Sequence, residues 1–112
     1  MNSKDKIYVA GCGGMLGEAF YKGFENSYHL KCTDISVNEK WISSLDFRDY
    51  DEYRRDVKEF KPNYLAHLGA HTDLEYCETN QEDTYITNTL AVENAVYIAN
   101  ELKIPIIYIS TA

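Results

Sequence analysis

The chain has 112 residues, a formal net charge of −7 and a composition that is 45% hydrophobic, which suits one folded domain with a core of its own. The negative charge argues against nucleic acid or an anionic membrane as a partner, because phosphate groups would be repelled, and no apolar run approaches the ~20 residues of a membrane span. Three cysteines in no regular pattern indicate free thiols in a reducing cytoplasm, and the N-terminus leaves no room for a signal peptide before the first predicted strand.

A strand-like run at residues 7–10 leads into the segment 11–17, Gly-Cys-Gly-Gly-Met-Leu-Gly, which holds four of the six glycines of the chain. This arrangement brings bare backbone close to a pyrophosphate. Gly11 permits the tight turn out of the strand, Gly14 lets the phosphates approach without a Cβ in the way, and Gly17 lets the next helix pack closely on the sheet. The unpaired N–H groups at the start of that helix then face the anion.

The context of this loop favours a dinucleotide site. The helix after it carries an apolar stripe of Met15, Leu16, Ala19, Phe20, Gly23 and Phe24. A short strand at 28–33 follows and ends at Asp34, 23 residues after Gly11, near the spacing of about 20 expected for the acid that binds a ribose hydroxyl. The alternative is a glycine-rich turn with Asp34 as a solvated carboxylate. A nucleotide-hydrolase loop is disfavoured, because Glu18-Ala19 follows the last glycine in place of Lys-Ser/Thr.

The later elements alternate between strand and helix. We expect a short strand at 41–45 ending at Asp46, a helix at 50–60 stopped by Lys61-Pro62, a buried strand at 64–68, a helix at 83–103 and a strand at 106–109. The long helix is expected to turn these residues inward: Leu90, Ala91, Ala95, Ile98, Ala99 and Leu102. Strands separated by amphipathic helices predict right-handed crossovers and a Rossmann-type doubly wound parallel sheet. Ligands of such sheets bind beyond the carboxyl ends of the strands. Because the chain stops after its best strand, we expect the sheet to be incomplete at its C-terminal side.

An ordered set of motifs runs through the chain: Gly11-x-x-Gly14-x-Leu16-Gly17, Asp34, Leu45-Asp46-Phe47-Arg48-Asp49, Lys61-Pro62-Asn63, Gly69-Ala70-His71-Thr72-Asp73, Cys77-Glu78, Asn88-Thr89-Leu90-Ala91, Asn94 and Tyr108-Ile109-Ser110-Thr111. In this order they resemble the extended short-chain dehydrogenase/reductase superfamily. Within it, the set is most similar to the dTDP-4-dehydrorhamnose reductases and related sugar-nucleotide epimerases and dehydratases. The resemblance covers nearly the whole chain.

The resemblance implies roles for particular residues. The dinucleotide is assigned Gly11, Gly14, Met15, Leu16 and Gly17 at the pyrophosphate, Asp34 at the adenosine ribose, Asp46 and Phe47 at the adenine, and Gly69, Ala70 and His71 along its middle. Thr111 takes the place of the catalytic Ser/Thr that hydrogen-bonds the substrate oxygen, and Asn88 that of a bracing helix asparagine. His71 stands where a tyrosine is usual, and Ala112 is more similar to the epimerases.

The implied activity is NAD(P)-dependent reduction of a 4-keto sugar carried on a nucleotide. The chain contains no Tyr-x-x-x-Lys, the pair that handles the proton in this chemistry, and no substrate lobe. We therefore expect residues 1–112 to be the NAD(P)-binding front portion of a longer architecture, inactive by itself. Because the Asp34 carboxylate repels a 2′-phosphate, NAD is favoured over NADP. The alternatives are a sugar-nucleotide epimerase and a non-catalytic NAD(P)-binding regulatory or sensor module. A homo-oligomer fits either.

Two other interpretations concern thiols and metals. The thiol of Cys12, at a helix start, is either acidified or a small filler in the loop, and filler is favoured. His71, Asp73, Cys77 and Glu78 show no recognised ligand spacing, so no metal site is expected. His67 falls in a buried strand and is expected to be a core histidine.

Overall fold

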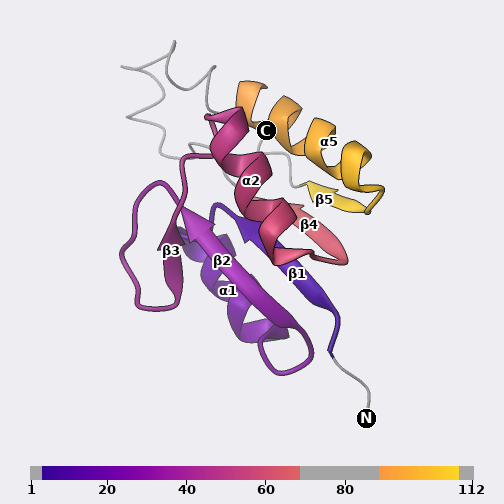
Figure 1. Cartoon of the computed structure of the whole chain (residues 1–112). Coiled ribbons are helices and arrows are strands. Elements are labelled where there is room, and N and C mark those ends of the chain that lie inside the picture. Colours follow the sequence, from indigo (N-terminus) through magenta and orange to yellow (C-terminus); the bar gives the residue numbers. More distant parts are fainter. Residues whose placement is uncertain (1–3, 69–88, 109–112) are drawn as a thin grey trace.

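The computed structural model describes residues 4–68 and 89–108. Within these ranges five parallel strands form one sheet in the order β3-β2-β1-β4-β5 (Figure 1). The strands are β1 (Lys6–Ala10), β2 (His29–Asp34), β3 (Ile42–Ser44), β4 (Tyr64–His67) and β5 (Ile106–Tyr108). The strand that precedes the glycine loop is therefore central, with β2 on one side and β4 on the other.

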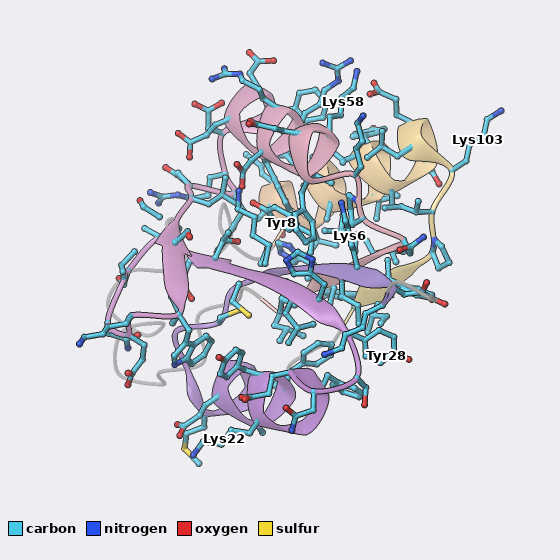
Figure 2. All side chains as sticks on the ribbon, turned by 60° about the horizontal axis from the view of Figure 1, so that its bottom comes forward. Lys6, Tyr8, Lys22, Tyr28, Lys58 and Lys103 are labelled. Atoms are coloured by element: carbon cyan, nitrogen blue, oxygen red, sulfur yellow. The ribbon has the colours of Figure 1, made fainter. Side chains whose placement is uncertain are left out.

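Helices cover both faces of the sheet. Helix α1 (Met15–Phe24) lies on one face, and α2 (Tyr50–Phe60) and α5 (Ala91–Leu102) lie on the other (Figure 2). This is the Rossmann-type doubly wound arrangement predicted from the alternation of strands and helices. None of the helices in the described ranges is long and apolar enough to cross a membrane.

The core under α2 and α5 is built from aromatic rings on one helix and small residues on the other. Its buried members are Tyr8, Ala10, Leu45, Phe47, Tyr53, Val57, Leu65, Ala91, Ala95, Ile98 and Ala99. The alanines at every fourth position of α5 lie along one stripe of that helix. The predicted inward face of α5 is thus confirmed, except that Leu90 is exposed at the helix start and Leu102 is only half-buried.

The core under α1 is built mainly from the strands and the loops that follow them. Its buried members are Ile7, Val9, Cys12, Cys32, Ile42, Ala66 and Leu68, with Phe20 and Tyr21 half-buried against them. Gly17 is the one fully buried residue of α1, whereas Met15 is 90% exposed and Leu16 and Phe24 are exposed too. The helix predicted after the loop is confirmed, but most of its apolar stripe is exposed, and Phe20 is the member that packs against the core. The contact of Gly17 with the strand end fixes the rotation of the helix and turns most of that stripe outward.

Both ends of α2 have a local explanation. The side chain of Asp49 accepts a hydrogen bond from the backbone N–H of Glu52, which satisfies one of the free donors of the first turn. The helix ends where Lys61 adopts a left-handed conformation with φ of 55° before Pro62. The predicted stop at Lys61-Pro62 is confirmed.

A buried tyrosine links the central strand to α2. The hydroxyl of Tyr8 donates to Oδ2 of Asp56 at 2.5 Å, and the ammonium of Lys31 contacts Oδ1 of the same carboxylate at 2.8 Å. Burial, followed by the hydrogen bond to Asp56, raises the pKa of Tyr8 far above its ordinary value. Tyr8 therefore stays a neutral donor throughout the physiological range.

The Tyr8→Phe variant should lose about 2 kcal/mol of the free energy of unfolding, because the bond it removes ends on a charged acceptor. Urea denaturation at pH 7 measures this loss. Tyr64→Phe is the control, since the hydroxyl of Tyr64 makes no hydrogen bond within the described residues. Equal losses for the two variants would contradict the assigned role of Asp56.

Candidate functional site

The carboxyl ends of β1, β2 and β3 meet at one edge of the sheet. There the backbone N–H of Gly11 donates to the carbonyl of Thr33 at 2.7 Å, and that of Leu45 donates to the carbonyl of Asp34 at 2.9 Å. The glycine loop, Asp34 and the segment around Asp46 are thereby brought together, as the parallel sheet predicts.

Glycine is suited to three positions of the loop for three different structural reasons. Gly11 has a φ of 93°, a conformation that L side chains rarely adopt. A Cβ on Gly17 would lie 2.4 Å from the Cα of Cys12, so α1 approaches the strand end to backbone contact. A Cβ on Gly14 would meet nothing within 4 Å. The space beside Gly14 therefore remains open to a ligand.

Helix α1 begins with free donors. Gly14 is its N-cap residue and provides no side-chain cap, and the first backbone bond of the helix runs from the N–H of Glu18 to the carbonyl of Gly14 at 3.1 Å. The N–H groups of Met15, Leu16 and Gly17 consequently have no acceptor within the helix. Together with the positive end of the helix dipole they form an anion-binding feature beside the open space at Gly14.

The earlier amides of the loop are already satisfied by protein. Gly11 and Cys12 both donate to the carbonyl of Thr33, and Gly13 donates to Oδ2 of Asp34 at 2.6 Å. The donors available to an anion therefore belong to the first turn of α1 rather than to the loop before it.

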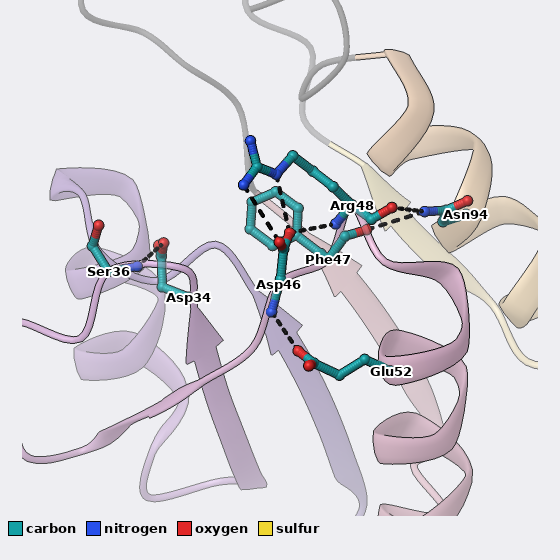
Figure 3. A network of polar contacts seen from close by, with 7 residues as sticks. All are labelled: Asp34, Ser36, Asp46, Phe47, Arg48, Glu52 and Asn94. Carbon is teal, nitrogen blue, oxygen red and sulfur yellow. Dashed lines mark hydrogen bonds and ion pairs between the residues drawn. The ribbon is translucent and has the colours of Figure 1, made fainter. Parts of the chain in front are cut away.

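The side chain of Asp34 holds the glycine loop at the end of β2. Besides the N–H of Gly13, its carboxylate accepts the N–H of Ser36 at 3.1 Å (Figure 3). The carboxylate is partly exposed and each oxygen has a second lone pair, so it can still accept from a ribose hydroxyl. The geometry is compatible with the predicted role of Asp34, which stays a prediction.

Asn38 is a residue of this site that the sequence analysis missed. Its side-chain N–H donates to the carbonyl of Gly13 at 3.1 Å, so the residue Gly13 is held through its N–H by Asp34 and through its carbonyl by Asn38. No motif marks this position. Only the contact across 25 residues identifies it.

The Asn38→Ala variant should lower the affinity for a dinucleotide severalfold, because Gly13 loses one of the two side chains that hold it. The free energy of unfolding should change by less than about 1 kcal/mol, since the lost hydrogen bond is exposed. Calorimetric titration with NADH and urea denaturation measure the two quantities. Ser36→Ala serves as the control, because Ser36 contributes only its backbone N–H; an equal loss of affinity there would count against Asn38.

The carboxylate of Asp46 forms an ion pair with Arg48. Its Oδ1 accepts from the backbone N–H and from Nε of Arg48, both at 3.0 Å, and its Oδ2 accepts from Nη2 at 3.3 Å. Its own N–H donates to Oε2 of Glu52 at 2.7 Å (Figure 3). Desolvation raises the pKa of Asp46, but the hydrogen bonds and the charge of Arg48 outweigh it and hold the pKa below its ordinary value.

This pKa shift gives a pH dependence of known sign. Because the pKa of Asp46 is lower in the folded chain, its stabilisation is present above the unfolded pKa of about 4 and is lost as the pH falls through the folded value. The Asp46→Asn variant should therefore lose less stability than the parent between pH 6 and pH 3. The difference should stay below about 1 kcal/mol, since the pair is partly exposed. Urea denaturation at the two pH values tests it, with exposed Glu59→Gln as the control; a parent-like slope for Asp46→Asn would contradict the assignment.

Phe47 does not present its ring at the edge of the sheet. The ring is buried in the core and lies edge-on to the imidazole of His67, with centroids 5.3 Å apart. Its carbonyl and that of Arg48 both accept from Nδ2 of Asn94 at 3.2 Å, so α5 braces this segment (Figure 3). A contact of Phe47 with adenine could involve only its backbone. The predicted contact of Phe47 with adenine is therefore restricted to its main-chain atoms, because its ring is packed in the core.

His67 is the core histidine that the strand pattern predicted. It is fully buried, and its Nδ1 lies 2.9 Å from the hydroxyl of Tyr53. The other predicted site residues Gly69, Ala70, His71, Asn88 and Thr111 lie outside the described residues, as do the weighed metal-ligand candidates His71, Asp73, Cys77 and Glu78. Within residues 4–68 and 89–108 no group of three acidic, histidine or cysteine side chains could hold a metal ion.

Known proteins are similar to this chain in sequence and in fold. Methionine adenosyltransferase 2 subunit beta of Xenopus laevis is 29% identical over 107 residues, which are 95% of this chain and 32% of the relative. The structure of L-threonine dehydrogenase from Clostridium difficile superposes with a TM-score of 0.86 at 19% identity, covering 96% of this chain and 36% of that one. A dTDP-4-dehydrorhamnose reductase from Bacillus anthracis, solved with NADP, gives 0.83 at 20% identity, covering 98% and 37%. The chain thus spans about a third of these relatives, and the structural likenesses show the fold.

A family model assigns the chain more directly than any single relative does. The model described as RmlD substrate binding domain matches residues 5–112, nearly the span over which the motifs resemble the dTDP-4-dehydrorhamnose reductases. The family expectation from the motifs is confirmed. The chain belongs to the RmlD substrate binding domain family.

Proposed function

We propose that this chain is the dinucleotide-binding portion of an NAD(P)-dependent oxidoreductase that reduces a 4-keto sugar carried on a nucleotide. One observation carries the proposal: the uncapped start of α1 lies beside open space at Gly14, at the edge of the sheet where Asp34 ends β2. A diphosphate fits the free N–H groups of that turn, and the position of Asp34 at the end of β2 supports its assignment to the adjoining ribose. The description of the Bacillus anthracis relative, a dTDP-4-dehydrorhamnose reductase in complex with NADP, supports the substrate class.

In this reaction the residues of this chain bind and orient the dinucleotide and the sugar. The first turn of α1 holds the diphosphate and Asp34 the adenosine ribose, while the segment from Asp46 to Arg48, braced by Asn94, borders the adenine. Thr111 hydrogen-bonds the sugar oxygen, by the family resemblance. When bound, the nicotinamide supplies the hydride. The proton comes from a tyrosine that residues 1–112 do not provide in a Tyr-x-x-x-Lys pair, so these residues bind the dinucleotide without turnover.

The cofactor is NAD in this proposal, because the Asp34 carboxylate disfavours a 2′-phosphate. The relatives include both kinds: the reductase from Bacillus anthracis was solved with NADP, and a UDP-glucose 4-epimerase from Thermus thermophilus was solved with NAD. The epimerase aligns with a TM-score of 0.77 at 17% identity, covering 88% of this chain and 35% of its own.

Titration of the chain with NADH and with NADPH tests the proposal. Trp41 is the single tryptophan and stacks on Tyr21 of α1, with centroids 4.2 Å apart, so its fluorescence reports on the neighbourhood of the loop. We expect saturable quenching, reversed by excess ADP-ribose, with tighter binding of NADH. Absence of binding for both nucleotides would overturn the proposed site.

A second candidate function is a non-catalytic dinucleotide-binding subunit. The observation that favours it is the curated relative, which is named as a subunit of methionine adenosyltransferase 2. The protein that contains this chain, assayed with nucleotide-linked 4-keto sugars, separates the two functions. Oxidation of NADH or NADPH supports the enzyme, whereas dinucleotide binding with no oxidation for any such sugar supports the subunit.

A further inference from the structure

Two cysteines meet underneath the glycine loop. Cys32 lies on β2, where its Cα is the register partner of Val9 on β1. Cys12 lies in the loop, and its thiol reaches back to the carbonyl of the same Val9 at 3.4 Å. Both side chains belong to the buried cluster under α1, and both cysteines lie beside Val9 of β1.

The surroundings of the two thiols differ from those of an isolated buried cysteine. The interaction between the two thiols, more than burial, raises the pKa of Cys12, and the same interaction lowers the pKa of Cys32. Both residues are free thiols and almost fully buried. Cys12 itself belongs to the glycine loop, in which Gly14 is exposed. Oxidation of the two buried thiols therefore requires a local opening of this loop.

We propose that Cys12 and Cys32 are a dithiol site that hydrogen peroxide converts to an intramolecular disulfide. The Cys32 thiolate attacks one peroxide oxygen, the O–O bond breaks, and hydroxide leaves with the electron pair and takes up a proton to become water. The resulting sulfenic acid is attacked by the sulfur of Cys12, an S–S bond forms, and a second water leaves. Both cysteines are oxidised by one electron each, and one peroxide is reduced to two waters.

The disulfide changes the loop because Cys12 cannot move alone. A bond of about 2.05 Å requires the sulfur atoms to approach more closely than two thiols in contact do. The backbone of Cys12 is packed so tightly against Gly17 that a Cβ on Gly17 would overlap the backbone of Cys12. A shift of Cys12 therefore displaces the first turn of α1. This consequence rests on the proposed function, in which that turn holds the diphosphate.

Mass spectrometry of the full chain tests the site without any nucleotide. The Cys77→Ser variant is the parent for this test, since the chain has three cysteines and the variant leaves only Cys12 and Cys32. After peroxide treatment we expect a monomer lighter by about 2 Da, restored by dithiothreitol. Cys12→Ser and Cys32→Ser in the same background should not lose this mass. A parent that gains only oxygen, stays unchanged or forms linked dimers would overturn the proposal.

A second measurement tests the link to the loop. The oxidised parent should bind NADH at least fivefold more weakly than the reduced parent, with recovery after dithiothreitol, and NADH should slow the mass loss. An unchanged affinity after complete oxidation would overturn the link to α1. If the reduced parent bound no dinucleotide, the proposed function would fail, while the mass measurement would still decide the disulfide.

Discussion

Replacing Gly17 by alanine is expected to cost about 3 kcal/mol of the free energy of unfolding or to prevent folding. The added Cβ would lie 2.4–2.6 Å from the Cα, carbonyl carbon and carbonyl oxygen of Cys12. These are backbone atoms of the loop just after the central strand, so no side chain can rotate away and α1 must move. Urea denaturation followed by Trp41 fluorescence measures the loss.

The matched control is Gly23→Ala in the same helix, where a Cβ meets nothing within 4 Å. This variant should keep or gain up to about 1 kcal/mol, because alanine loses less backbone entropy than glycine in a helix. Similar stability for Gly17→Ala and Gly23→Ala would mean that α1 does not approach the strand as closely as described.

Gly14→Ala separates stability from binding at the same loop. Gly14 has an extended conformation with φ of −106°, and its Cβ would point into open space. The free energy of unfolding of the Gly14→Ala variant should change by less than about 1 kcal/mol. Its affinity for NADH should fall at least tenfold, because the added methyl group occupies the space proposed for the diphosphate.

The second large effect is expected for Asp34→Ala, in which the NADPH affinity relative to that of NADH should rise at least tenfold. The carboxylate repels a 2′-phosphate, and its removal takes away this discrimination. Because Asp34 also holds the N–H of Gly13, both affinities should fall in absolute terms. The ratio of the two dissociation constants, measured by calorimetry, is therefore the informative quantity.

Asp34→Asn distinguishes charge from loop support. Asparagine keeps an acceptor for the N–H of Gly13 but carries no charge, so the affinity ratio should shift as in Asp34→Ala with a smaller loss for both nucleotides. A ratio that stays at the parent value in both variants would remove Asp34 from cofactor selection.

The predicted elements and their order came from local patterns. Glycines at 11, 14 and 17 after a strand, the apolar spacing of Tyr53 and Val57 and the stop at Lys61-Pro62 each act within a few residues, and all were found in the structure. The side of α1 that faces the sheet could not be predicted this way. Hydropathy favoured Met15 and Leu16, but the close approach of Gly17 to Cys12 decided the rotation.

The sequence alone therefore determined the fold class, the position of the uncapped first turn of α1 and the acid at the end of β2, because short-range geometry and the register of parallel strands set them. The tertiary structure alone decided that Asn38 hydrogen-bonds to Gly13, that Arg48 forms an ion pair with Asp46 and that the Phe47 ring is buried in the core. Contacts such as that from Asn94 to Phe47 join residues 47 positions apart. Which partner a polar group finds at that range depends on how whole elements pack, and no local pattern records it.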